Sequence, residues 1–299
     1  MCEQALRTLP AYALVTPARN EETFLAATVD AIAAQTVRPL RWIIVSDGST
    51  DRTDAIAQTA AGQHDWIEAV ILPPRTKRDF AGKVRAFDAG MDRLRGLDYE
   101  IVGNVDADTT FDPDYFEFVL RHFADNPRLG VGGTPVVEGG ATYDFRFASD
   151  MHVSGPCQLF RRACFEDIGG YQPIARGAID WVAVTTARMK GWETRSFMGK
   201  TYMHHRQMGT QGAGVLRSRF RYGQKDYSVG GHPLWEVSRS VYHMTQPPYI
   251  IGGLFLLAGY TWAGIRRLER PVSPALMQFH RAEQMQRLRR LLGRGDRSR

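Results

Sequence analysis

Two aspartates, Asp106 and Asp108, follow a short apolar run in the segment NVDADT. Carboxylates at the end of a buried strand can hold a hard divalent cation together with diphosphate oxygens. Such a cation neutralises the charge that develops on a departing nucleoside diphosphate. Because two aspartates at this spacing also occur in solvated turns, the pair is informative only together with other groups.

Asp47 and Lys83 are two further candidates for nucleotide binding. Asp47 lies in SDGSTDRT, where its carboxylate can accept a hydrogen bond from a pyrimidine or ribose, or where the turn can cap a helix. Lys83 follows a glycine in AGKVRAFDAG, at the start of a predicted helix, where a cation and free backbone amides suit a phosphate. The segment does not match the G-x-x-x-x-G-K-[ST] phosphate loop of ATPases.

The second half of the chain offers a base and further ligands. Asp180 begins an apolar stretch with helical character, so it could be a general base toward an acceptor hydroxyl or a helix N-cap. His204 or His205 could complete the coordination of the cation, or could be purely structural. Four arginines suit a diphosphate or a solvated basic face: Arg206, Arg217, Arg219 and Arg221.

These side chains need elements that position them. Short apolar runs predict strands that are buried on both faces: residues 11–16, 42–46, 67–72 and 100–105. Helical periodicity at residues 22–35 and 50–61 separates them, which predicts an open parallel sheet with helices on both faces. Ligands bind at the carboxyl ends of such strands, where Asp47 and Asp106 lie. From about residue 110, aromatic and glycine-rich segments predict a further helix, strand and short helix.

Five motifs in this order resemble glycosyltransferase family 2: PARNEE, SDGSTDRT, AGKVRAFDAG, NVDADT and FRRACFEDIGGY. The resemblance covers roughly residues 10–205. It implies the GT-A fold, a Rossmann-like open mixed sheet flanked by helices, and sugar transfer with inversion at the anomeric carbon. The sequence departs from the family at Asp88, where asparagine is usual, and at Ile179, where an acidic residue often precedes the base.

The resemblance also implies roles for individual site residues. Asp180 would be the catalytic base, and Asp106 and Asp108 would bind the metal, Mn²⁺ or Mg²⁺. His204 is the further candidate ligand by its residue type rather than by the resemblance. A UDP- or GDP-sugar would be contacted by Pro17, Arg19, Glu21, Asp47, Lys83 and Asp106. Processive members carry Q-x-x-R-W, whereas the nearest segment here, SRFRYGQ, lacks the tryptophan, so transfer of a single sugar is expected.

Charge is distributed unevenly along the chain. The formal net charge is +6, but residues 266–299 hold ten arginines against three acids. A basic tail beside an apolar stretch favours anionic lipid and argues against nucleic acid as a partner. The N-terminus lacks the pattern of a secretory leader, and three cysteines (Cys2, Cys157 and Cys164) predict neither a disulfide framework nor a zinc cluster.

Two domains are expected, a catalytic domain at residues 1–215 and a helical appendage at residues 216–299. The appendage joins an apolar segment, residues 247–265, to the basic tail at 266–299. The apolar centre would form a helix of about 25 Å, at the lower limit for spanning a bilayer. An interfacial or re-entrant segment is therefore expected, with a buried helix as the alternative. Its candidate anchors are Tyr249, Tyr260 and Trp262.

Together these features predict a glycosyltransferase enzyme, of the hexosyltransferase type, in polysaccharide biosynthesis. The acceptor would be a hydroxyl of a polyprenyl-linked or other membrane-bound glycan, and the protein would be peripheral or monotopic at the cytoplasmic face of the inner membrane. One alternative is a sugar-nucleotide pyrophosphorylase, but PARNEE lacks the glycine-rich basic loop expected there. The other is a non-catalytic nucleotide-sugar-binding module, whose acidic motifs would be broken.

Overall fold

The computed structural model describes residues 8–74, 80–138, 141–142, 150–174, 177–206, 214–291 and 293. The chain divides into two compact units: Met1–Ala175 with Ile179–Arg206, and Arg176–Ala178 with Gln207–Arg299. Cys2 lies outside the described residues, and Cys157 and Cys164 are free and buried.

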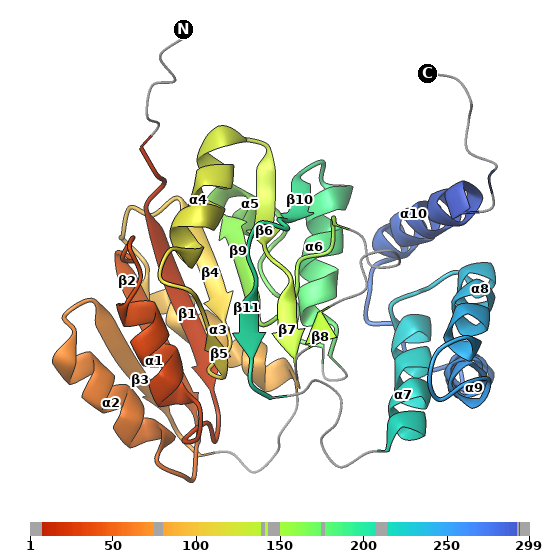
Figure 1. The fold of residues 1–299 in the computed structure, drawn as a ribbon, viewed down its shortest axis with the longest axis horizontal. Helices are drawn as coiled ribbons and strands as arrows, with labels where there is room; N and C mark the ends of the chain where they lie inside the picture. The colour runs from red at the N-terminus through yellow and green to blue at the C-terminus, as the bar shows by residue number, and fades with distance from the viewer. Residues whose placement is uncertain are drawn as a thin grey trace, which may run out of the picture. The chain divides into compact units, whose positions relative to one another are not determined.

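The first unit is built on a seven-stranded sheet in the order β10-β6-β9-β4-β1-β2-β3 (Figure 1). The four apolar runs form parallel strands: β1 (Tyr12–Ala18), β2 (Arg41–Asp47), β3 (Ile67–Leu72) and β4 (Ile101–Val105). Beyond β4, the strand β9 (Cys157–Arg161) runs antiparallel to both β4 and β6 (Leu129–Gly133), and β10 (Glu193–Ser196) is parallel to β6. The sheet is therefore mixed, as the GT-A resemblance implies, and differs from the wholly parallel arrangement in that β9 runs opposite to the other strands of this sheet.

Helices cover both faces of this sheet, and the alternation of strand side chains decides which helix meets which face. Leu14 and Trp42 share a buried cluster with three helices: α1 (Leu25–Ala33), α2 (Thr53–Gln63) and α4 (Tyr115–Asp125). Val15, the neighbour of Leu14 in the chain, points to the other face and packs against α3 (Phe80–Arg93). A β-carbon on Gly90 of α3 would overlap Val15, so the close approach of this helix requires glycine. The helices α5 (Arg162–Asp167) and α6 (Ile179–Met189) complete the unit.

A second, smaller sheet joins segments that are far apart in the chain. Its order is β5-β11-β7-β8, with strands at Thr109–Thr110, Tyr202–His204, Val136–Glu138 and Ala141–Thr142. The β11 strand pairs with β5 so that His204 lies opposite Thr109, and it pairs with β7 on its other side. This pairing brings His204 beside the DAD segment that follows β4.

The described residues of the second unit form four helices: α7 (Val215–Ser228), α8 (Pro233–Met244), α9 (Ile251–Ile265) and α10 (Pro274–Leu291). Glycines let α7 and α9 pack backbone against backbone, because a β-carbon on Gly223 would overlap the Leu256 carbonyl and one on Gly259 the Phe220 carbonyl. Among the helices described, each is too short or too polar to cross a bilayer. Tyr260 is not the exposed anchor expected, since it is buried and donates a hydrogen bond to the Gly231 carbonyl at 2.8 Å.

Glu236 of α8 makes the stability of the second unit sensitive to pH. Burial, and then the charge of Asp226, raise the pKa of Glu236 to about 8, although Arg239 opposes this shift. A carboxyl with a raised pKa in the folded state stabilises the fold below its unfolded value of 4.5, and that contribution is lost as the pH rises through 8. We therefore expect Glu236→Gln to reduce the loss of thermal stability over this pH window. Melting curves of wild type, Glu236→Gln and the exposed control Glu269→Gln measure this, and equal pH slopes for all three would refute it.

Candidate active site

Predicted site residues gather where the first two strands and β4 end. Asp47 is the last residue of β2 and is 6% exposed. Arg19 follows β1, and its Nη1 lies 3.9 Å from Asp47 Oδ2. Pro17 lies within β1, in register with Val45 of β2. The structure thus brings three of the predicted nucleotide contacts to one edge of the sheet, the edge at which ligands bind in this class of fold.

Asp106, Asp108 and His204 form a cluster of candidate metal ligands. Their ligand atoms all lie within 4.8 Å of one another. His204 Nε2 is 3.2 Å from Asp108 Oδ1, and both residues are buried. His205 lies elsewhere, with Nε2 2.9 Å from the Thr110 hydroxyl and its ring stacked on Phe24. Of the two histidines considered, the structure therefore brings His204 to the aspartates.

Glu138 contacts the ring nitrogen of His204 that faces away from Asp108. Its Oε1 lies 2.7 Å from His204 Nδ1, so a proton on Nδ1 would leave the Nε2 lone pair directed at the aspartate side. Burial alone would lower the pKa of His204, but the hydrogen bond and charge of Asp108 outweigh it and raise that pKa. The segment VVEGG carries no motif that marks Glu138, which reaches the site only because β7 and β11 pair.

Glu21 and Arg206 form a second pairing that sequence reasoning does not reveal. Arg206 donates from Nη1 and Nη2 to the two Glu21 carboxylate oxygens at 2.8 and 2.6 Å, and its Nε is 3.8 Å from Asp108 Oδ2. Burial, and then the charge of Asp108, raise the pKa of Glu21 to about 7 against the effect of Arg206. Glu21, which the resemblance predicts as a nucleotide contact, holds a guanidinium beside Asp108 in the structure.

Lys83 pairs with Asp106, the first aspartate of the acidic cluster. The lysine lies in the first turn of α3, and its Nζ forms an ion pair with Asp106 Oδ1. Both side chains remain about a quarter exposed, at 27% and 23%. A cation that balances Asp106 and stays accessible is suited to contact an incoming diphosphate.

Asp180 lies in the first turn of α6 and packs on Gly155. A β-carbon on Gly155 would be 2.6 Å from Asp180 Oδ2. The Gly155 carbonyl accepts a hydrogen bond from Asn104 Nδ2 at 2.9 Å, and the same amide is 3.5 Å from Asp106 Oδ1. After burial, the charges of Asp180 and Asp106 are the largest causes of the raised pKa of Tyr171. Asp180 and the metal-ligand candidates thus belong to one site.

Asp106, Asp108 and His204 suit a divalent ion by their chemistry. Carboxylate oxygens are the ligands that Mg²⁺ and Mn²⁺ prefer, and neutral imidazole is a common additional ligand. Three protein ligands leave coordination positions for diphosphate oxygens, and a carboxylate behind the histidine is a typical supporting group. The residues present therefore fit the expected metal ion.

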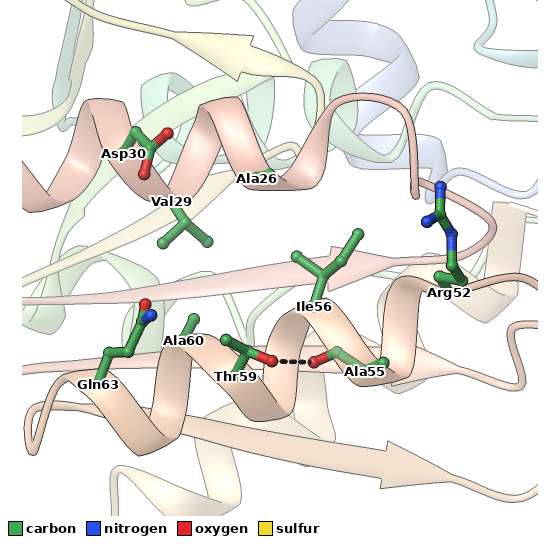
Figure 2. Close-up of a pocket in the computed structure, with 9 residues that line it drawn as sticks. All are labelled: Ala26, Val29, Asp30, Arg52, Ala55, Ile56, Thr59, Ala60 and Gln63. Carbon is green, nitrogen blue, oxygen red and sulfur yellow. Dashed lines mark hydrogen bonds between the residues drawn. The ribbon is translucent and has the colours of Figure 1, made fainter.

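A separate pocket of about 420 Å³ lies between α1 and α2 (Figure 2). Its lining is largely apolar and includes Val29 and Ile56, with Arg52 at one end. None of the predicted catalytic, nucleotide-binding or metal-binding residues lines it. This pocket is therefore not part of the candidate active site.

Glu138→Gln is expected to weaken metal binding by about 10- to 100-fold, because an amide holds the His204 ring less firmly than a carboxylate does. Calorimetric titration of the purified protein with Mn²⁺ measures this effect directly. Glu166→Gln, which alters an exposed glutamate on α5, serves as the matched control. Unchanged Mn²⁺ affinity in Glu138→Gln would show that Glu138 does not support the site.

Comparison with known proteins places residues 13–178 in the family described as Glycosyl transferase family 2. Putative glycosyltransferase EpsH of Bacillus subtilis (strain 168) is 29% identical over 159 residues, covering 52% of this chain and 43% of EpsH. Poly-beta-1,6-N-acetyl-D-glucosamine synthase of Staphylococcus epidermidis is 26% identical over 170 residues, covering 50% of this chain and 39% of the synthase. The chain thus spans less than half the length of these two relatives.

Two solved structures share the fold at low sequence identity. Mannosyltransferase PcManGT from Pyrobaculum calidifontis, in complex with GDP-Man and Mn²⁺, has a TM-score of 0.57 and 19% identity, covering 95% of this chain and 83% of its own. S. aureus TarS 1-349 in complex with UDP-GlcNAc has a TM-score of 0.56 and 16% identity, covering 90% and 78%. At these identities the likeness establishes the fold alone.

Proposed function

Because this chain belongs to glycosyl transferase family 2, we propose that it transfers one sugar from a nucleotide sugar to a hydroxyl of a glycan acceptor. The observation that carries the proposal is the arrangement of Asp106, Asp108 and His204 in one site with Asp180. The site combines a cation-binding group with a separate carboxylate, which are the two groups that a direct displacement from a nucleotide sugar needs.

The donor in this proposal is a UDP- or GDP-sugar. Proteins of similar fold are solved with UDP-GlcNAc and with GDP-Man and Mn²⁺. Pro17, Arg19 and Asp47 would contact the nucleoside at the ends of β1 and β2, and Lys83 would contact the diphosphate. Arg206, held by Glu21, adds a second positive charge beside Asp108.

In the proposed reaction Asp180 accepts the proton of the acceptor hydroxyl. The acceptor oxygen then forms a bond to the anomeric carbon, the bond from that carbon to the diphosphate oxygen breaks, and the configuration inverts. Mn²⁺ or Mg²⁺ held by Asp106, Asp108 and His204 would stabilise the negative charge of the leaving nucleoside diphosphate. Lys83 would support the same charge from the first turn of α3.

The proposed acceptor is a membrane-bound glycan, such as a polyprenyl-linked sugar. The proposed catalytic domain, residues 1–215, is followed by an appendage, residues 216–299, that combines an apolar helix with a basic tail. Such a combination suits a peripheral or monotopic protein at the anionic cytoplasmic face of a membrane. An enzyme held there would meet a lipid-linked acceptor at its headgroup.

Thermal stabilisation by a panel of nucleotide sugars, with and without Mn²⁺ or Mg²⁺, tests the donor and the metal together. A ligand at about 100 times its Kd stabilises a protein by about 2.7 kcal/mol, which gives a measurable increase in Tm. We expect one nucleotide sugar to increase the Tm only when the metal is present. Failure of every member to shift the Tm would contradict the proposal, as would formation of a nucleotide sugar from a sugar phosphate and a nucleoside triphosphate.

A further inference from the structure

The α8 helix places its polar residues inside and its apolar residues outside. Glu236 and Ser240 are buried at 1% and 0% exposure, whereas Leu234, Val237 and Val241 are exposed at 58%, 46% and 56%. The exposed positions recur at helical spacing and form one continuous stripe. A helix of a water-soluble protein normally has the opposite distribution, with its apolar stripe against the core.

The polar side of α8 is engaged with charged groups of its own unit. Arg239 forms an ion pair with Asp226 of α7, and its Nε lies 3.8 Å from Glu236 Oε2. Burial alone would lower the pKa of the Arg239 guanidinium, but chiefly the charge of Asp226 outweighs this effect and raises that pKa. These partly buried contacts lie on the polar side of α8, and the outward apolar stripe faces the solvent.

The α9 helix exposes a second apolar stripe. Five side chains are at least 40% exposed and lie on one side of the helix: Ile251, Leu254, Phe255, Trp262 and Ile265. The opposite side is small and packs on α7 through Gly259 and on α8 through Gly253. Contacts of this kind, in which glycines let helix backbones approach closely, are typical of helices that pack in lipid.

Tyr249 and Ile250, which connect α8 to α9, are also exposed, at 65% and 61%. We call the exposed side chains of α8, α9 and this connection the apolar face of the second unit. An exposed apolar surface that extends over two helices and the connection between them indicates an interaction site.

Positive charge borders the apolar face. Arg266 and Arg267 follow the last residue of α9 directly, and both are exposed. The described part of the second unit from residue 214 to residue 291 contains twelve lysines and arginines against four acids. An apolar stripe that ends in arginines matches a bilayer with anionic headgroups, because the apolar groups enter the acyl boundary while the cations bind phosphates.

We propose that α8 and α9 insert the apolar face into one leaflet of an anionic lipid bilayer, without crossing it. At 12 and 15 residues, the helices would measure about 18 and 22 Å, less than the hydrocarbon thickness of about 30 Å. This inference deepens the proposed membrane location by naming the surface and its partner. The inference rests on the proposed function in one respect, since a membrane-bound acceptor explains why the enzyme would bind a membrane.

Sedimentation with phosphatidylcholine vesicles, with and without phosphatidylglycerol, tests the inference on the full chain. We expect the wild type to bind vesicles that contain phosphatidylglycerol and high salt to weaken the binding. The double variant Leu254→Glu and Phe255→Glu should lose about tenfold or more in vesicle affinity. Leu40→Glu is the matched control, since Leu40 of the first unit is 49% exposed and Leu254 is 50% exposed.

A second readout reports insertion itself. Trp262 is 41% exposed on the apolar face, so its fluorescence should shift to shorter wavelength on vesicle binding. The difference between the spectra of wild type and Trp262→Phe isolates this residue from the other five tryptophans. Melting curves of each variant confirm that the fold is kept.

Three outcomes would overturn the inference. The first is wild-type protein that remains in the supernatant, and the second is a double variant that binds vesicles as well as Leu40→Glu does. The third is a wild type that does not bind vesicles but forms a concentration-dependent dimer, which the double variant does not form. Transfer activity separates this inference from the proposed function. Vesicle binding without sugar transfer would contradict only the proposed transfer reaction, and sugar transfer without vesicle binding would contradict the inference together with the proposed membrane location.

Discussion

Asp108→Asn is expected to reduce sugar transfer by about 10³-fold or more, because it removes the carboxylate that is proposed to hold the metal against the leaving diphosphate. Asp108 is 6% exposed and contacts both His204 and Arg206, so water cannot replace the lost ligand without rearrangement. The effect should appear in turnover at saturating donor and also in Mn²⁺ affinity. Labelled sugar transfer and calorimetric titration measure the two quantities.

The same substitution should leave the fold intact. Asparagine has the shape of aspartate, and removal of this charge relieves the repulsion that raises the pKa of Glu21. The hydrogen bond from His204 is lost in part, which costs about 1 kcal/mol and is offset by this relief. The exposed Asp92→Asn on α3 is the matched control and should keep full activity. An Asp108→Asn protein that retains activity, or that fails to fold, would refute the metal assignment.

Asp180→Asn is expected to lower kcat by about 10²- to 10⁴-fold, the usual contribution of a general base. Donor and metal affinity should be retained, because Asp180 lies on α6 and is not among the three metal-ligand candidates. This combination of results separates a base from a binding residue. Equal losses in Mn²⁺ affinity and in kcat would assign Asp180 to the metal site, and full activity would exclude it as the base.

A glycine substitution provides an independent check on Asp180. A β-carbon on Gly155 would lie 2.6 Å from Asp180 Oδ2, so Gly155→Ala must displace this carboxylate or the loop that carries residue 155. We expect kcat to fall by about tenfold or more, since small displacements of a catalytic group are costly. Gly62→Ala is the control, because a β-carbon there meets only open space. Unaltered kcat in Gly155→Ala would show that the position of Asp180 is unimportant.

Local sequence patterns were sufficient for the parts of the fold that depend on neighbouring residues. The four apolar runs and the helices between them are governed by periodicity, and they match β1 to β4, α1 and α2 within a few residues. Asp47 and Asp106 could be assigned to strand ends for the same reason. The GT-A resemblance added the mixed character of the sheet, which depends on β9 running antiparallel and has no local signature.

Contacts between distant segments could not be predicted from local patterns. Glu138 reaches His204 through the pairing of β7 and β11, and Arg206 reaches Glu21 across most of the catalytic unit. The buried side of α9 could not be predicted either, because the sequence around Tyr260 is apolar on every side of the helix. Packing through Gly223 and Gly259 turns Tyr260 inward and leaves Trp262 outside.

Sugar transfer from a nucleotide sugar should depend on a metal ion at Asp106, Asp108 and His204. The most direct test of this dependence is transfer of labelled sugar from UDP- and GDP-sugars to a bacterial membrane lipid fraction, with chelator and then with added Mn²⁺ or Mg²⁺. We expect transfer from one donor that chelator abolishes and metal restores, and no restoration in Asp108→Asn. Transfer that persists in chelator, or that metal restores equally in Asp108→Asn, would contradict it.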